Sequence, residues 1–216
     1  MATPGDIGAN REPIAAGLGM DDEGVESEPP SSADSSGLLL EVVVEDGDWS
    51  GIGPDEAHLE ALVARVAGVL SASTELAAST ELAAILDGPS VACVAFSDDA
   101  AVRDLNQRYR GQDKPTNVLS FPAGPTVPGD MTRIAGELSV EPHGLGDIVL
   151  AAGTVAREAA DLGIPMIHHV QHLVVHGVLH LLGFDHETDA EAETMEALER
   201  VLLARLGVAD PYSLKE

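Results

Sequence analysis

Three histidines near the C-terminus constrain the local fold more than any other feature of the chain. They lie in the run His176-Gly-Val-Leu-His180-Leu-Leu-Gly183-Phe-Asp-His186. His176 and His180 are four residues apart, so a helix places them one turn apart on the same face. Gly183 can end that helix in a left-handed turn and bring His186 back toward the other two. Three converging imidazoles are typical of a tetrahedral zinc site whose fourth position stays open to water.

The neighbours of these histidines leave some roles open. A histidine pair on an apolar helix can also serve packing or capping, but the third histidine and the glycine at fitting offsets favour a metal site. We interpret His172, one turn before His176, as a structural or supporting residue, and His168 as a surface residue. Ligating histidines need an acceptor for their other ring nitrogen. Asp185, Glu187 and backbone carbonyls are the candidates for that role.

The spacing of the histidines resembles that of the metzincin proteases, whose motif is H-E-x-x-H-x-x-G-x-x-H. In this chain Gly177 stands where those proteases have a glutamate. A protease of this type needs that carboxylate to take a proton from water at the metal. The pattern therefore predicts a metal site and disfavours a peptidase.

The N-terminal segment differs from the rest of the chain. Residues 1–36 are rich in Gly, Pro, Ser, Asp and Glu, with no aromatic residue and one basic residue, Arg11. Such a segment cannot bury enough apolar surface to offset its ordering entropy, so we expect a disordered acidic tail followed by one domain over residues 37–213. We find no secretory signal pattern and expect no membrane span, which favours a cytoplasmic protein. The single Cys93 is expected in the core, without a disulfide framework.

The charge of the chain limits its partners. The net charge is −26. Eight acidic residues and one arginine lie in residues 1–36, which leaves about −19 on the domain and argues against broad affinity for phosphate. Four of the eleven basic residues nevertheless fall within twelve positions: Arg103, Arg108, Arg110 and Lys114. Arg103 and Arg108 can equally belong to a solvated helix face.

Strand and helix patterns alternate along the chain. Strands are expected at residues 38–45, 91–97, 117–121, 136–140 and 147–151, and a loop at 123–133. Helices are expected at residues 54–71, 99–109 (capped by Asp98), 154–162, 168–182 and 189–206 (ended by Gly207). A tandem repeat of Ser-Thr-Glu-Leu-Ala-Ala at residues 73–84 is interpreted as a local duplication that lengthens a helix or loop. The pattern predicts an α+β fold, a small mixed four-stranded sheet with packed helices.

Two motifs in the right order resemble the YbeY-type endoribonucleases, which are bacterial rRNA maturation factors. One is the histidine run. The other is Leu105-Asn106-x-x-Tyr109-Arg110-Gly111-x-Asp113-Lys114-Pro115-Thr116-Asn117-Val118-Leu119-Ser120-Phe121-Pro122. Gly146-Asp147-Ile148 and Asp210-Pro211-Tyr212 are also similar to segments of that family. The resemblance covers roughly residues 38–213, and the hexapeptide repeat and residues 123–140 look like additions.

The resemblance implies a zincin-like fold that binds one Zn²⁺ per chain through His176, His180 and His186. It implies an endoribonuclease acting on single-stranded RNA, in maturation of the 3′ end of 16S rRNA and in ribosome quality control. Arg110 would be the functionally important arginine of the RNA cleft. The implied partners are rRNA and the small ribosomal subunit with its proteins, and neither DNA nor a membrane is expected.

The chemistry of the residues agrees with that reaction class. Zinc with an open position can polarise a phosphoryl oxygen and activate water. An arginine binds phosphate through two parallel charge-assisted bonds. The RNA 2′-OH could itself be the nucleophile, which would dispense with the missing glutamate, and attack by water stays an equal alternative. Because the domain is acidic, we expect phosphate contacts only at zinc and between Arg103 and Lys114, with weak or partner-assisted binding.

Two other functions fit parts of the pattern. A metal-dependent hydrolase of another substrate, such as a small phosphoester or an amide, is possible because three histidines do not define a substrate. A ribosome assembly factor with structural zinc is the second alternative. Structural zinc sites are normally closed by four protein ligands. His172 or Asp185 in the fourth position would favour that alternative.

Overall fold

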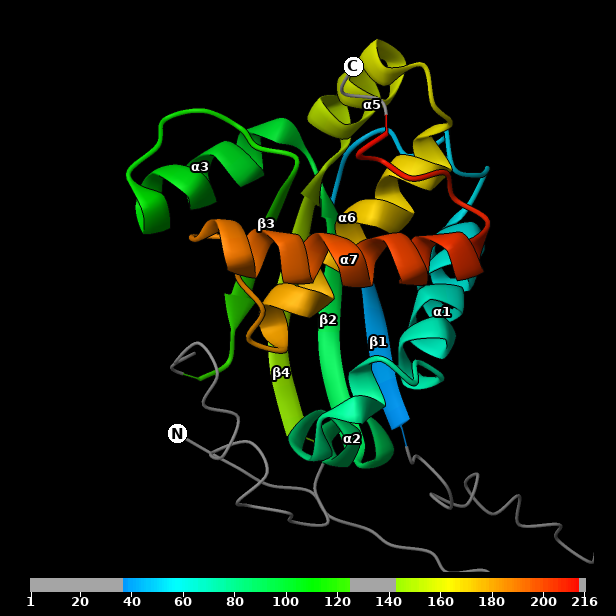
Figure 1. Ribbon diagram of the computed structural model, residues 1–216. Coiled ribbons are helices and arrows are strands. Elements are labelled where there is room, and N and C mark those ends of the chain that lie inside the picture. The colour runs from blue at the N-terminus through cyan, green and yellow to red at the C-terminus, as the bar shows by residue number, and fades with distance from the viewer. Residues whose placement is uncertain (1–36, 125–142, 214–216) are drawn as a thin grey trace, which may run out of the picture. The chain divides into compact units, whose positions relative to one another are not determined.

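The computed structural model describes residues 37–124 and 143–213. The proposed acidic tail, the strand expected at residues 136–140 and most of the expected loop at 123–133 lie outside the described residues. The described part contains a four-stranded sheet in the order β1-β2-β4-β3, with helices packed on it (Figure 1). This confirms the α+β fold with a small mixed sheet.

The sheet combines parallel and antiparallel pairs. Its strands are β1 (Gly37–Val44), β2 (Pro89–Ser97), β3 (Val118–Pro122) and β4 (His143–Ala151). The pairs β1–β2 and β2–β4 are parallel, whereas β3 runs antiparallel to β4. The strand β3 therefore forms one edge of the sheet, and one flank of its backbone has no neighbouring strand among the described residues.

Most helices pack on one face of the sheet. They are α1 (Glu56–Ser71), α2 (Thr80–Asp87), α5 (Ala152–Leu162), α6 (Met166–Leu181) and α7 (Asp189–Leu206). The main core joins alternate residues of β2 and β4, such as Phe96 and Ile148, to apolar residues of α1, α6 and α7. The helix α6 lies between the sheet and α7 (Figure 1), and most of its residues are buried. The histidines of α6 are thus carried by a rigid central element.

The helix α3 (Asp99–Arg110) packs on the opposite face of the sheet, against residues that alternate with those of the main core. Its Val102 joins a small cluster with Ala95, Leu119 and Val149. The Asp98 side chain accepts a hydrogen bond from the Ala101 N–H, as expected for the N-cap. Cys93 was expected in the core, but it is only half-buried. It occupies a β2 position that alternates with the core-facing residues, and the apolar run concealed that alternation.

The two copies of the hexapeptide repeat fold differently although their first turns are alike. In each copy the serine accepts a hydrogen bond from the leucine N–H three residues later, Ser73 from Leu76 and Ser79 from Leu82. The first copy stops after the 3₁₀ turn η1 (Leu76–Ala78), because Ser79 is extended to cap α2. Both leucines are buried. The duplication therefore adds a second capped turn to the edge of the core.

One stretch, Glu56–Ala78, is apolar and long enough to cross a membrane by length and composition alone. The sequence had led us to expect no such stretch. In the structure it consists of α1 and η1 with a turn between them, and α1 directs Leu59, Val63 and Val66 into the core. These side chains pack as they do in the core helix of a globular domain.

Candidate metal centre

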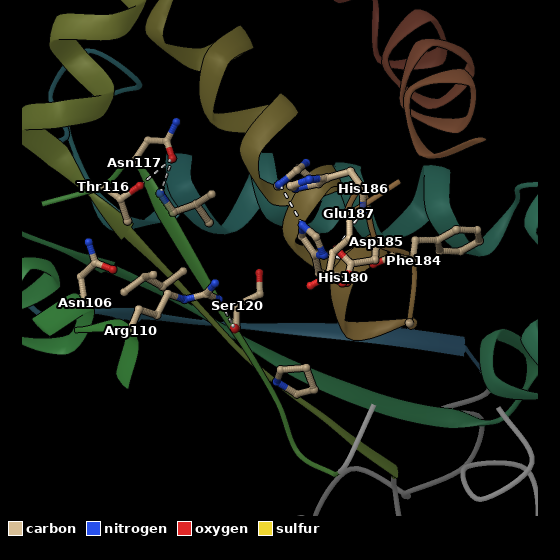
Figure 2. A pocket seen from close by; sticks show the side chains of 15 residues that line it. Asn106, Arg110, Thr116, Asn117, Ser120, His180, Phe184, Asp185, His186 and Glu187 are labelled. Carbon is tan, nitrogen blue, oxygen red and sulfur yellow. Dashed lines mark hydrogen bonds between the residues drawn. The ribbon is translucent and has the colours of Figure 1, made fainter. Parts of the chain in front are cut away.

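The three predicted ligands converge in space. His176 and His180 lie one turn apart on α6, with ring centroids 4.5 Å apart. His186 follows in the segment after that helix, and Figure 2 shows it near His180. One potential ligand atom from each histidine lies within 4.8 Å of the others. The Nε2 atoms of His176 and His180 are 3.1 Å apart. Two nitrogens bound tetrahedrally to one zinc at about 2.0–2.1 Å are about 3.4 Å apart, so the pair fits that ion.

The turn after α6 both ends the helix and orients a ligand. Gly183 adopts a positive φ of 86°, which a side chain would disfavour. The Phe184 N–H then donates to the Leu179 carbonyl, and the Phe184 carbonyl accepts a hydrogen bond from His180 Nδ1. Because a carbonyl oxygen only accepts, the proton of neutral His180 sits on Nδ1 and its lone pair on Nε2. His180 is therefore prepared to ligate through Nε2.

The start of α7 holds the third ligand's segment from the other side. The Thr188 hydroxyl accepts from the Glu191 N–H, and the Glu191 carboxylate accepts from the Thr188 N–H. This reciprocal pair is a capping box. His186 lies in the short link between Gly183 and Thr188, so both ends of its segment are held by helix termini.

A buried carboxylate that we did not predict supports the first ligand. Glu199 of α7 is fully buried, and its Oε1 accepts a hydrogen bond of 2.8 Å from His176 Nδ1. The other oxygen accepts from His172 Nε2 at 3.3 Å and from the Tyr212 hydroxyl. Glu199 thus holds the proton of His176 on Nδ1 and leaves Nε2 for a metal. His172 supports the site through Glu199 and is not part of the metal cluster, as expected.

The acceptors for the ligating rings were therefore predicted in part. A backbone carbonyl, which was one of the expected acceptors, accepts the hydrogen bond of His180. For His176 the acceptor is Glu199, and not the expected Asp185 or Glu187. The Asp185 carboxylate instead accepts the backbone N–H of His186. The sequence does contain a signal for Glu199: it is a charged residue at a position where the helical repeat of α7 places apolar, core-facing residues. Met195, Glu199, Leu202 and Leu206 all face the core from α7.

The electrostatics of the cluster favour metal binding over protonation. Burial, together with the charges that His176 and His186 would carry, lowers the pKa of His180 to about 4. Burial would raise the pKa of Glu199, but hydrogen bonds from His172, His176 and Tyr212 outweigh it and lower that pKa to about 2. At neutral pH the site thus combines a neutral imidazole and a buried carboxylate. A deprotonated histidine with a carboxylate behind its neighbour suits a metal ion, because metal ligands must give up their protons.

We expect Glu199→Gln to weaken zinc binding by about 10- to 100-fold, the usual effect of losing a carboxylate behind a ligating histidine. The glutamine keeps the shape of the side chain but removes the charge that stabilises the proton on His176. Competition against a chelator of known zinc affinity measures the change. Glu193→Gln on the same helix is the control, since Glu193 is exposed and lies outside the metal cluster. Equal affinities of the two variants would show that Glu199 does not support the metal.

Gly177 explains why no protease-like glutamate occupies this helix position. A Cβ added at Gly177 would lie 2.9 Å from two atoms of Ile148, which is fully buried on β4. The position faces the sheet, and any side chain there would have to displace the core. The absence of the protease carboxylate is therefore built into the packing of α6 on the sheet.

The same packing makes a stability prediction. We expect Gly177→Ala to lower the free energy of unfolding by about 1–2 kcal/mol, because overpacking against Ile148 outweighs the helix propensity gained. Gly68→Ala on α1 has open space around it and should raise the free energy by up to about 1 kcal/mol. Urea unfolding of both variants gives the comparison. Stabilisation by both substitutions would contradict the close packing.

The histidines open into a cavity of about 790 Å³ that also contains Arg110. Figure 2 shows His180 of α6 and His186 of the following turn on one side, and Asn106 and Arg110 of α3 on the other, with β3 between them. The Arg110 Nη2 atom lies 3.5 Å from the Ser120 carbonyl oxygen, and the Ser120 hydroxyl lies 3.5 Å from the Gly177 carbonyl oxygen. The edge strand β3 thus links the arginine to the metal helix.

The basic group from Arg103 to Lys114 divides into two parts. Arg103 makes two hydrogen bonds to the Asp113 carboxylate, and Arg108 pairs with Asp104. Their surface pairing supports the solvated-face interpretation, and neither lines the cavity. Among the described residues, the Arg110 guanidinium contacts only the Ser120 carbonyl and pairs with no carboxylate. Its guanidinium therefore keeps donors available for an anion in the cavity.

Comparisons with known proteins agree with these motifs. The family model described as Endoribonuclease YbeY matches residues 53–207. Relatives with that name are 44% identical over 175 residues in Sinorhizobium fredii (81% of this chain, 92% of the relative) and 47% over 173 residues in Rhodopseudomonas palustris (80% of each). A solution structure from Thermotoga maritima aligns with a TM-score of 0.45 at 21% identity, covering 80% of this chain and 98% of that one.

The extent of these matches decides the family. The family model spans well over half of the chain, and the relatives are matched over most of their own length. The matched range contains the three histidines, Glu199 and Arg110. The chain therefore belongs to the YbeY family of endoribonucleases.

Proposed function

We propose that this chain is a zinc-dependent endoribonuclease that cleaves single-stranded RNA, in maturation of the 16S rRNA 3′ end and in ribosome quality control. It would act in the cytoplasm on rRNA of the small ribosomal subunit, through a catalytic domain at residues 37–213. The observation that carries the proposal is the cavity into which both the histidine cluster and Arg110 open.

His176, His180 and His186 would hold one zinc ion. The first two would ligate through Nε2, because Glu199 and the Phe184 carbonyl engage their Nδ1 atoms. When bound, zinc supplies a Lewis acid for a phosphoryl oxygen and an open coordination position. Among the described residues the metal cluster has three members, which favours an open site over a structural one.

Arg110 would bind the phosphate on the opposite side of the cavity. Its position follows from the end of α3, where Gly111 adopts a left-handed conformation and caps the helix. The Asn106 side chain donates to the Lys114 carbonyl at 2.8 Å and so holds the following loop against α3. A guanidinium near the charge that develops on the phosphoryl oxygens would stabilise the transition state.

The nucleophile can be the RNA 2′-OH or water. The buried contact of Gly177 with Ile148 leaves no space for the carboxylate that proteases use as a base. The product ends separate the two routes. A 2′,3′-cyclic phosphate supports attack by the 2′-OH, and a 5′-phosphate with a 3′-OH rules that route out.

Purified protein tests the proposal directly. We expect about one zinc per chain, cleavage of single-stranded RNA, little cleavage of the same sequence in a duplex, and loss of activity after chelation. Zinc alone should restore the activity. Cleavage that continues unchanged in the metal-free protein would contradict the proposal, whereas activity restored only by another metal would correct the cofactor.

A further inference from the structure

Tyr109 is the one strongly exposed aromatic side chain in the described part of the chain, with 64% of its surface accessible. The protein has only two Tyr, three Phe and one Trp. The other aromatic residues are buried or half-buried: Trp49, Phe96, Phe121, Phe184 and Tyr212. The ring of Tyr109 therefore offers solvent a large apolar face with a polar hydroxyl at its tip.

The exposed ring is nevertheless held in place. Tyr109 and Phe121 form an edge-to-face pair, with ring centroids 5.2 Å apart and an interplanar angle of 66°. Phe121 in turn packs against the small core under α3. Tyr109 is therefore carried by α3 and packed against a ring of β3, and a flat ligand would meet a ring that has already lost much of its freedom.

Each ring is adjacent in sequence to residues that line the cavity. Tyr109 directly precedes Arg110 on α3, and Phe121 lies between Ser120 and Pro122 on β3. Arg110, Ser120 and Pro122 all line the cavity that contains the histidines. An RNA strand that runs from the histidine cluster past Arg110 could continue to the exposed ring of the neighbouring residue, Tyr109.

We infer that Tyr109, supported by Phe121, forms a stacking subsite for one base of the RNA beside the Arg110 end of the cavity. This inference rests on the proposed function of the same site. Aromatic rings accept the flat face of any base, and a base in a duplex has both faces covered by its neighbours. The subsite would therefore select unpaired RNA with little preference for sequence.

A variant series combined with modified RNA tests the subsite. The probe is a short labelled single-stranded RNA, together with a set in which one nucleotide at a time lacks its base. Binding is measured by fluorescence anisotropy in a His180→Ala background, which keeps the RNA intact. Cleavage by the corresponding metal-loaded full-length proteins is measured in parallel. The proteins carry Tyr109, Tyr109→Ala, Tyr109→Phe, or the control Leu162→Ala, which replaces an exposed apolar residue of α5 outside the cavity.

We expect Tyr109→Ala to weaken RNA binding by about 5- to 140-fold, the effect of losing one base–aromatic stack. Tyr109→Phe keeps the ring and should bind several-fold more tightly than the alanine variant. Leu162→Ala should leave binding and the melting temperature unchanged. Removing the base at one RNA position should weaken binding to the protein that keeps Tyr109 but not to the Tyr109→Ala protein. The base removal and the alanine substitution delete the same stacking contact, so their effects should not add.

Each outcome bears on a separate claim. Equal RNA affinity of the Tyr109 and alanine proteins would overturn the subsite and leave the exposed ring as a surface for a protein partner. Equal losses at every abasic position would overturn it as well, since no base would then be coupled to Tyr109. A wild-type protein that binds RNA but leaves it intact would contradict the proposed function, and the binding series would still decide on the subsite.

Discussion

Replacing His180 by alanine is expected to release the zinc and to reduce RNA cleavage by about 10³-fold or more. The ring of His180 lies 3.1 Å from that of His176 and points its Nε2 into the cluster. Two histidines that are left cannot form the three-ligand site of a catalytic zinc. A Lewis acid contributes several kcal/mol to the transition state, and each 1.36 kcal/mol is tenfold in rate.

The measurement is zinc content together with cleavage of a single-stranded RNA at matched protein concentrations. His58→Ala is the control, because His58 is an exposed histidine that pairs with Asp55 outside the cavity. It should keep both zinc and activity. RNase activity that survives His180→Ala at the wild-type level would come from a contaminant and would remove the basis of the enzyme assignment.

Replacing Arg110 by alanine is expected to lower kcat/KM for RNA by about 10²- to 10³-fold, the usual effect of removing one donor from a charged transition state. The zinc content should not change, since Arg110 reaches the cavity from α3 and contacts Ser120 on β3. The fold should also persist, because Arg110 is exposed. Loss of activity with zinc retained would separate phosphate binding from metal binding.

Two further variants define what Arg110 contributes. Arg110→Lys keeps the charge but not the planar pair of donors, so we expect only part of the activity to return. Arg108→Ala removes a neighbouring charge that is paired with Asp104 and should change kcat/KM by less than about twofold. If Arg108→Ala and Arg110→Ala had the same effect, Arg110 would act through the overall electrostatic field of the protein and not as a specific phosphate ligand.

The sequence predicted most of the described helices and strands because their local signals agree with their packing. The helix from Asp99 to Arg110 is an example: Asp98 caps its start and Gly111 its end. The histidine helix was recognised in the same way, from the four-residue spacing of His176 and His180 and from Gly183 after them. Local chemistry is sufficient where a cap, a period and a stop signal coincide.

The supporting residues of the site were harder to predict because they depend on contacts between distant elements. Glu199 is 23 residues from His176 and reaches it only because α7 packs across α6. Arg103 finds its partner Asp113 beyond the end of α3. Sequence spacing could not distinguish this paired arginine from Arg110, which opens into the cavity. Tertiary packing decides these roles.

The coordination shell of the zinc-loaded protein tests the central claim most directly. A crystal structure with anomalous data at the zinc edge should show one zinc per chain, bound by the Nε2 atoms of His176 and His180 and by a ring nitrogen of His186. The fourth ligand should come from solvent or substrate, as in a catalytic site. A fourth protein ligand that closes the site, or zinc bound elsewhere on the chain, would contradict the account.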